Sequence, residues 1–209
     1  MSRLCIKSDY TDYYDKLSNS NAVITYNRYE STCKQRGTAL KYLRNLGINT
    51  IEVKQVNQFL RLEGPIVVYT DTKKHHSNGK KIMTVDEAML TYENYTASKF
   101  YKSTDGITLK YLQIGKRRFA LYFQKSEPFS LELGKLISIK ELDSDYNKII
   151  RLPIYSIDYI SNNGITIATD FNEVENLQRI GINHYLTEQE IMNEIEESLV
   201  FYNNIKRKG

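Results

Sequence analysis

The chain is poor in cysteine, proline and tryptophan. Its 209 residues include two cysteines, three prolines and no tryptophan. Cys5 and Cys33 both lie in apolar patterns, which favours buried thiols over a disulfide. No apolar run approaches the roughly 18 residues that a membrane-spanning helix needs. The N-terminus also lacks the apolar core and cleavage site of a secretory signal. We therefore expect a cytoplasmic protein with no membrane partner.

Motifs of the common catalytic and metal sites are missing as well. His75 and His76 are adjacent, and His184 is the third and last histidine, so no zinc-type spacing exists. The segment 72–81 lacks the glycine spacing and the Lys-Ser/Thr ending of a P-loop. No serine elbow and no Cys/His pair is present. We therefore expect no metal site and no cofactor, and we favour a binding protein over an enzyme.

Tyrosine and unevenly placed charge are what the sequence has in quantity. There are 17 tyrosines, and the formal net charge is +4. The segment 72–125 holds eleven Lys/Arg against four Asp/Glu, whereas 170–202 holds one Arg against eight Asp/Glu. Such asymmetry is typical of a basic side that faces a polyanion, or of an acidic helix that is solvated at one end.

Local periodicity predicts an α/β or α+β fold in which helices flank a mixed β-sheet with a central β-hairpin. The chain shows no internal repeat or linker, so we expect one domain over 1–209, with a weaker subdivision near 126–128. Capping boxes predict helices that start at Thr84 and Thr187. The first of these is expected to run to about residue 101, and the second to bury Ile191, Ile195 and Leu199. A further helix is expected over 27–46, with Arg36 outward. Strands are expected over 3–8, 22–28, 49–53, 64–71, 135–142, 151–161 and 164–170.

The hairpin over 107–124 is the clearest local pattern. Gly115-Lys116 suits a two-residue turn, which pairs Gln113 with Arg118, Tyr111 with Ala120 and Leu109 with Tyr122. One face then shows Tyr111, Arg118 and Tyr122, and the other carries the apolar core side. Tyrosines beside arginine suit base stacking together with phosphate contact, although ordinary cross-strand pairing explains the same pattern.

Candidate ligand-binding residues extend from this hairpin to the basic loop before it. Pocket acids are expected at the ends of strands, where α/β sheets bind ligands. These acids are Asp9, Asp71 and Asp158; Asp170 has the same placement but also suits a helix cap. The candidate phosphate and base contacts are Lys73, Lys74, Lys80, Lys81, Tyr111, Lys116, Arg117, Arg118 and Tyr122.

The opening "SDYTDYYD" raises the question of a metal or phosphate site. With Ser8 as helix cap, its tyrosines form one stripe and its aspartates the other side, so a helix start explains it without a ligand. This opening resembles a family of uncharacterised accessory proteins encoded by large tailed bacteriophages. The matching residues are Ser8, Asp9, Asp12, Tyr13, Tyr14 and Asp15, and "LPIYSIDYI" and "NLQRIGINHYLTEQEIMNEI" are similar too. The resemblance implies a protein made in the cytoplasm of an infected bacterial cell.

Three functions are compatible with these patterns. The first is binding of nucleic acid or a nucleotide through a basic, tyrosine-bearing surface. The second is counter-defence or host takeover, by capture of a host protein or a cyclic-nucleotide signal. The third is a metal-dependent enzyme that processes nucleotides, with Asp9 or Asp158 as metal ligands. The sequence leaves the oligomeric state open.

Overall fold

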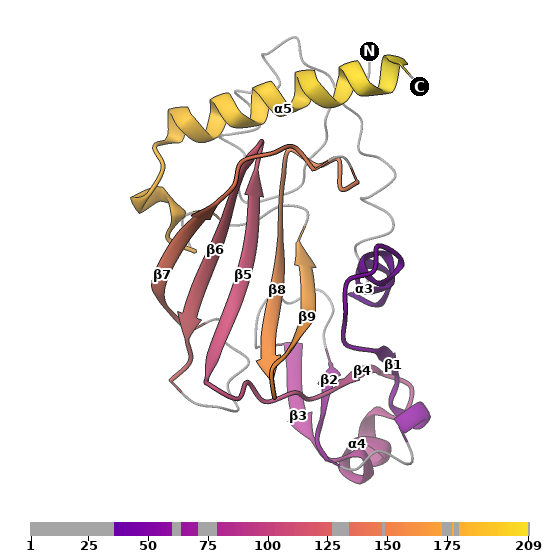
Figure 1. Ribbon diagram of the computed structural model, residues 1–209. Coiled ribbons are helices and arrows are strands. Elements are labelled where there is room, and N and C mark those ends of the chain that lie inside the picture. Colours follow the sequence, from indigo (N-terminus) through magenta and orange to yellow (C-terminus); the bar gives the residue numbers. More distant parts are fainter. Residues whose placement is uncertain are drawn as a thin grey trace.

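The fold consists of two antiparallel β-sheets with helices packed against them. The computed structural model describes residues 36–59, 64–70, 79–126, 134–147, 149–172, 177 and 180–208. In Figure 1, helix α5 runs across one end of the larger sheet, and the smaller sheet lies near the opposite end. The α+β class, the flanking helices and the central hairpin are confirmed, but the strands form two antiparallel sheets where one mixed sheet was expected.

The smaller sheet has four strands in the order β1-β4-β2-β3. One of its faces packs against α4 (Val85–Tyr92) and the 3-10 helix η1 (Val56–Phe59) around buried Ile66, Val68 and Ala97. Successive residues of a strand point to opposite faces, so Val67 and Tyr69 lie on the other side. The strands are β1 (Val53–Gln55), β2 (Ile66–Tyr69), β3 (Lys80–Met83) and β4 (Thr96–Lys99).

The larger sheet has five strands in the order β7-β6-β5-β8-β9. Its strand pairs are all antiparallel, and an isolated parallel bridge joins Thr50 to Ala168 beside its β9 edge. The strands are β5 (Ile107–Ile114), β6 (Arg117–Gln124), β7 (Lys135–Leu142), β8 (Ile154–Asn162) and β9 (Ile165–Asn172).

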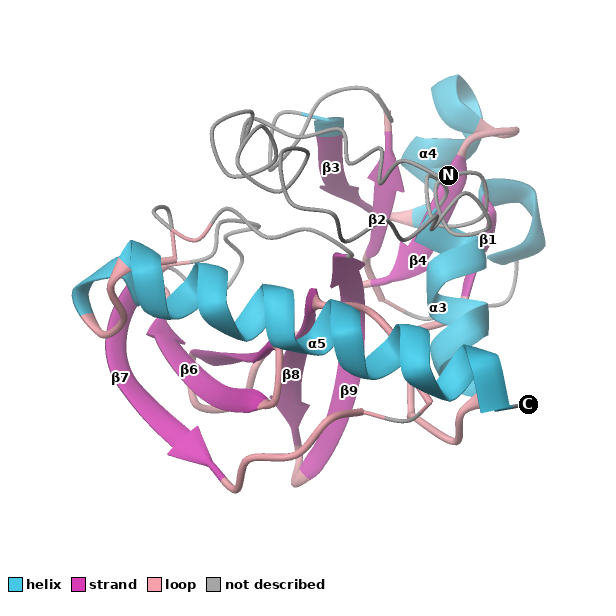
Figure 2. Cartoon of the chain, turned by 90° about the horizontal axis from the view of Figure 1, so that it is seen from above, coloured by secondary structure: helices cyan, strands magenta, loops and turns pink. Residues whose placement is uncertain are grey.

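Two helices cover opposite faces of the larger sheet. Helix α5 (Glu188–Lys208) buries Ile191, Ile195 and Leu199 against one face, as predicted. Helix α3 (Arg36–Asn45) buries Leu40 and Leu43 against the other, beside β9. Figure 2 shows α5 lying across the sheet, with α3 beside β9. Each fully buried leucine or isoleucine contributes about 1.5 to 3 kcal/mol, so both helices are held by their apolar stripes. The remaining described helical turn is the 3-10 helix η3 (Ile182–His184).

The hairpin register is confirmed, and one predicted helix is wrong in its second half. Gln113 pairs with Arg118 and Tyr111 with Ala120, around a turn in which Gly115 has φ +57°. The capping box of Thr84 and Glu87 is present at the start of α4. That helix ends at Tyr92, and residues 96–99 form β4, because β4 completes the ladder between β1 and β2.

Within the described part of the chain, no helix combines the length and the apolarity that crossing a bilayer requires.

Candidate functional site

Three charged side chains lie in one row across the larger sheet. Lys110 of β5 is the direct partner of Asp158 on β8, and Asp158 is the direct partner of Asp170 on β9. Directly opposed residues of neighbouring strands point to the same face, so the three side chains are neighbours. The row places two carboxylates side by side next to one ammonium group.

Like charges directly opposite each other are destabilising unless nearby charges compensate them. Here Lys110 Nζ lies 2.5 Å from Asp158 Oδ1, and Arg36 Nη2 lies 2.8 Å from Asp170 Oδ2. The Lys110 side chain is only 3% exposed. A buried ion pair often stabilises a protein no more than apolar residues of the same size would. A charged row in the middle of a sheet therefore indicates a functional site more than a stabilising one.

The smaller sheet adds Lys80 and Tyr69, which are cross-strand partners on β3 and β2. They lie on the face away from α4, since the neighbouring Val68 packs in the core beneath that helix. Burial, and to a smaller extent the charge of Arg36, lowers the pKa of Lys80 to about 8. The charges of Asp170 and Asp158 oppose this shift. Lys80 therefore lies within electrostatic reach of the charged row on the larger sheet.

Tyr69 is buried in the smaller sheet and lies against the Arg36 side chain of α3. Its hydroxyl is 2.8 Å from the Ser98 hydroxyl, and the Arg36 guanidinium lies 5.0 Å from its ring centroid. Burial raises the pKa of the phenol, so it stays neutral. Lys125, just after β6, also belongs here, because burial lowers its pKa and Asp158 opposes that shift. We call this group the inter-sheet charge cluster: Arg36, Tyr69, Lys80, Lys110, Lys125, Asp158 and Asp170.

Counted over the residues that the structure describes, the cluster holds four basic side chains and two carboxylates. This excess of positive charge favours an anionic ligand, and the adjacent carboxylates can share a divalent cation. Among the described residues no group of three or more His, Cys, Asp or Glu could hold a metal ion by itself. Two carboxylates nevertheless suit Mg²⁺, which usually keeps several waters and binds through one or two carboxylates together with phosphates of a substrate.

The structure brings two of the sequence-predicted site residues, Lys80 and Asp158, into this cluster. Lys81 points to the other face of its sheet, where its Nζ donates to the Tyr92 hydroxyl at 2.8 Å. The remaining loop lysines and two of the predicted acids lie outside the described residues: Lys73, Lys74, Asp9 and Asp71.

Two of the three basic residues at the hairpin turn, Lys116 and Arg117, are paired with carboxylates, and Arg118 donates to a backbone carbonyl. Lys116 Nζ lies 2.8 Å from a Glu197 carboxylate oxygen on α5. Arg117 donates to both carboxylate oxygens of Glu141 on β7, at 2.7 and 2.9 Å. Arg118 donates to the Asp143 carbonyl. These pairings join the hairpin to α5 and β7, and they reduce the positive charge that the turn offers to a polyanion.

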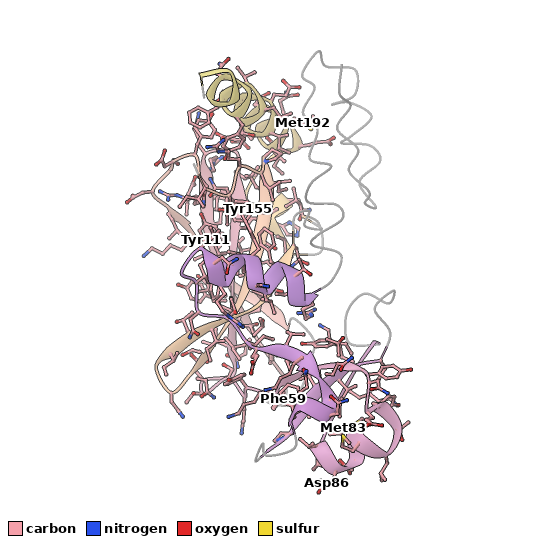
Figure 3. The ribbon with its side chains drawn as sticks, turned by 90° about the vertical axis from the view of Figure 1, so that its right-hand side faces the viewer. Phe59, Met83, Asp86, Tyr111, Tyr155 and Met192 are labelled. Carbon is pink, nitrogen blue, oxygen red and sulfur yellow. The ribbon has the colours of Figure 1, made fainter. Side chains whose placement is uncertain are left out.

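Of the two predicted stacking tyrosines, Tyr111 is half-buried beside Tyr155, with ring centroids 5.9 Å apart. Its hydroxyl donates to Gln113 Oε1 at 2.7 Å. Figure 3 shows Tyr111 and Tyr155 near each other in the larger sheet, level with helix α3. Tyr122 is also half-buried. Tyr111 therefore contributes to the packing beneath α3 as well as to the surface.

Sequence reasoning missed several members of the cluster. Arg36 was expected to point outward from its helix, Asp170 was expected to cap a helix, and Lys110 and Lys125 were not singled out. In the structure Asp170 instead accepts from Arg36 and from the Phe171 amide. One pattern could have indicated the site. A lysine within a strand of otherwise apolar inward residues, as Lys110 is, needs a buried anionic partner.

No protein-family model matches the sequence, and no curated protein matches it either. Solved structures do match. A RiPP-associated ATP-grasp ligase from Chryseobacterium gregarium, in complex with ADP and a leader and core peptide, has a TM-score of 0.62 at 13% identity. That match covers 88% of this chain and 65% of the ligase.

Two further structures agree with this match. The macrocyclase MdnC from Microcystis aeruginosa, bound with its precursor peptide MdnA, has a TM-score of 0.54 at 15% identity, and the match covers 88% of this chain and 64% of MdnC. The D-alanine–D-alanine ligase from Bacillus anthracis has a TM-score of 0.52 at 14% identity, over 97% of this chain and 87% of the ligase. This chain shares its fold with these three proteins. It spans just under two thirds of the first two.

Proposed function

We propose that this protein binds a nucleoside di- or triphosphate, together with Mg²⁺, at the inter-sheet charge cluster, and that it is a metal-dependent enzyme that processes nucleotides. The observation that carries the proposal is the cluster itself: four basic side chains around two adjacent carboxylates where the two sheets meet. A nucleotide with a divalent cation is a ligand that needs both kinds of group.

The shared fold supports the same proposal. The Chryseobacterium ligase of the same fold is in complex with ADP. Fold alone does not establish an activity, so the proposal rests on the cluster and uses the likeness as support.

In this proposal each group has a defined task. Asp158 and Asp170 hold the cation from neighbouring strands, with water completing its coordination. Lys80 and Lys125 approach the phosphates from two directions, because one lies on the smaller sheet and the other follows β6 of the larger sheet. Charge-assisted hydrogen bonds of this type are shorter and stronger than neutral ones. A cation held there would neutralise negative charge on the phosphates.

This proposal replaces the hairpin surface as the principal binding site. Lys116 and Arg117 are held by carboxylates of α5 and β7, whereas the cluster has more cations than acids. Nucleic-acid binding by the hairpin stays a prediction, as does capture of a host protein. The bacteriophage setting also stays a prediction, because neither a family model nor a curated protein matches the sequence.

The test is calorimetric titration of the full chain with ADP in the presence of MgCl₂. We expect binding, and we expect the double variant Asp158→Asn/Asp170→Asn to weaken it by about tenfold or more, because it removes both carboxylates that would hold the cation beside the phosphates. The matched control is Asp86→Asn in α4, which Figure 3 shows at the far end of the smaller sheet. No heat and no saturation with ADP or ATP would overturn the proposal.

A further inference from the structure

Arg36 contacts groups from both sheets. Its Nη2 donates to Asp170 on β9 at 2.8 Å, its Nη1 donates to the Thr169 carbonyl at 2.7 Å, and its guanidinium lies over the Tyr69 ring of β2. The side chain is 21% exposed. One guanidinium therefore fixes the carboxylate that would serve as a cation ligand.

A β-bulge makes this arrangement possible. Asp158 pairs with Asp170, but the next residue, Tyr159, pairs with Ala168, so Thr169 has no opposite partner. A bulged residue leaves the ladder and re-aims its backbone groups. Here the Thr169 carbonyl points to Arg36, and the Thr169 hydroxyl donates to the Asp158 carbonyl at 3.2 Å. The bulge gives the guanidinium two acceptors side by side.

Both carboxylates of the cluster are thus paired with an internal cation, Asp170 with Arg36 and Asp158 with Lys110. A divalent cation that arrived alone would add charge +2 to a region that already holds four basic side chains. Like charges repel one another more strongly inside a protein than in water, because the surroundings screen them less. A cation that arrives with a polyphosphate meets no such barrier, because the phosphates supply the missing negative charge.

We infer that Arg36 is an exchangeable counter-ion, which holds Asp170 until a divalent cation and a polyphosphate arrive together and then moves from the carboxylate to the phosphate. This inference rests on the proposed function and adds that the divalent cation and the nucleotide must bind together. A guanidinium suits both positions, since its planar donors match carboxylate and phosphate oxygens equally well. The site therefore binds cation and nucleotide cooperatively and excludes the free cation.

The experiment compares three titrations of the full chain: with Mn²⁺ alone, with ADP alone, and with ADP in saturating Mg²⁺. The electron paramagnetic resonance signal of free Mn²⁺ measures how much Mn²⁺ is bound. For the unmodified protein we expect no Mn²⁺ binding in the absence of ADP, and ADP affinity at least tenfold higher with Mg²⁺ than without. In Arg36→Gln we expect Mn²⁺ to bind alone, and the gain in ADP affinity from Mg²⁺ to fall several-fold. The matched control is Lys41→Gln, an exposed lysine on the same helix, which should behave as the unmodified protein.

A measurement without a substitution guards against misfolding of the variant. In ¹⁵N-labelled protein, the Nε–H resonance of Arg36, assigned by its absence in Arg36→Lys, should shift when ADP and Mg²⁺ are added together but not with Mg²⁺ alone. If ADP fails to bind even with Mg²⁺, the proposed function is wrong. If ADP binds while Arg36→Gln changes neither Mn²⁺ binding nor the coupling, or the resonance stays in place, the counter-ion inference is wrong and nucleotide binding stands.

Discussion

Gly115 illustrates, at the scale of a single residue, how little room the hairpin turn leaves. Its φ of +57° lies in the left-handed region, and a Cβ built on it would lie 2.3 Å from the Glu194 carbonyl oxygen of α5. The neighbouring Lys116 amide donates to the Glu194 carboxylate. The turn and the helix are therefore in contact through backbone atoms, which cannot move aside as a flexible side chain would.

We expect Gly115→Ala to lower the free energy of unfolding by about 2 to 4 kcal/mol. The left-handed conformation alone costs an alanine about 1 to 2 kcal/mol, and relief of the clash with α5 costs the rest. Urea denaturation measures the change. Gly164→Ala is the control, because Gly164 has a similar φ of +78° with no atom within 4 Å of the added Cβ. Equal losses in the two variants would contradict the contact with α5.

The residues of the cluster were only partly predictable from the sequence, because some that lie together in the structure are far apart along the chain. Lys80 was singled out from a basic run and Asp158 as a strand-end acid, although the structure places Asp158 in the middle of β8. Arg36 and Asp170 meet across 134 positions of sequence, and nothing near either residue indicates the other. An arginine on a helix is usually solvated, so its inward contact becomes visible only when α3 is placed beside β9.

At the scale of elements, helix α5 depends on its first turn. Glu190 Oε2 accepts from the Thr187 amide at 2.8 Å and from the Thr187 hydroxyl at 2.7 Å, and the Glu190 amide donates back to that hydroxyl. Two hydrogen bonds lower the pKa of Glu190 below its ordinary 4.5. The larger effect comes from the Thr187 amide and the smaller from the Thr187 hydroxyl. The charged carboxylate is the form that caps the helix.

We therefore expect acid to weaken this cap. A carboxylate whose pKa is lower in the folded state contributes stability above the unfolded pKa of about 4.5, and that stability is lost as the pH falls through the folded pKa. Urea denaturation between pH 6 and pH 3 should show a smaller pH dependence for Glu190→Gln than for the unmodified protein. Glu196→Gln, an exposed residue of the same helix, is the control. Identical profiles for the unmodified protein and Glu190→Gln would exclude this role.

The elements themselves were largely predictable where local rules decide them. Both capping boxes and the β5–β6 register follow from short-range patterns, and the structure has them all. The β8–β9 turn also has a clear pattern, since Asn163-Gly164 takes positive φ at both residues. Residues 96–99 were misassigned to a helix because pairing with β1 and β2 outweighs the local preference.

At the scale of the whole molecule, Lys80 links the binding site to pH. Burial, and to a smaller extent the charge of Arg36, lowers the pKa of this amine to about 8, so it loses its proton in the range just above physiological pH. Bound phosphate favours the protonated form. ADP affinity in the presence of Mg²⁺ should therefore be steady near pH 6.5 and should weaken as the pH rises through about 8.

Calorimetric titration from pH 6.5 to pH 9.5 tests this dependence. Lys80→Met should bind ADP more weakly at pH 6.5 and should lose most of the decline at higher pH. Lys81→Met is the control, since Lys81 lies on the opposite face of the same strand and donates to Tyr92. A decline of equal size in Lys80→Met would assign the pH dependence to another group.

The strand order also sets when the cluster can exist during folding. The β5–β6 and β8–β9 hairpins each close through a two-residue turn, whereas the β5–β8 ladder joins distant segments, as in the contact between Lys110 and Ser156, 46 positions apart. Closing such a loop costs more chain entropy than closing a hairpin, so it comes late. Lys110 meets Asp158 only across that ladder. A chain in which the two hairpins are still apart thus lacks the Lys110–Asp158 ion pair, and newly made protein acquires that pair at the step that unites the two hairpins.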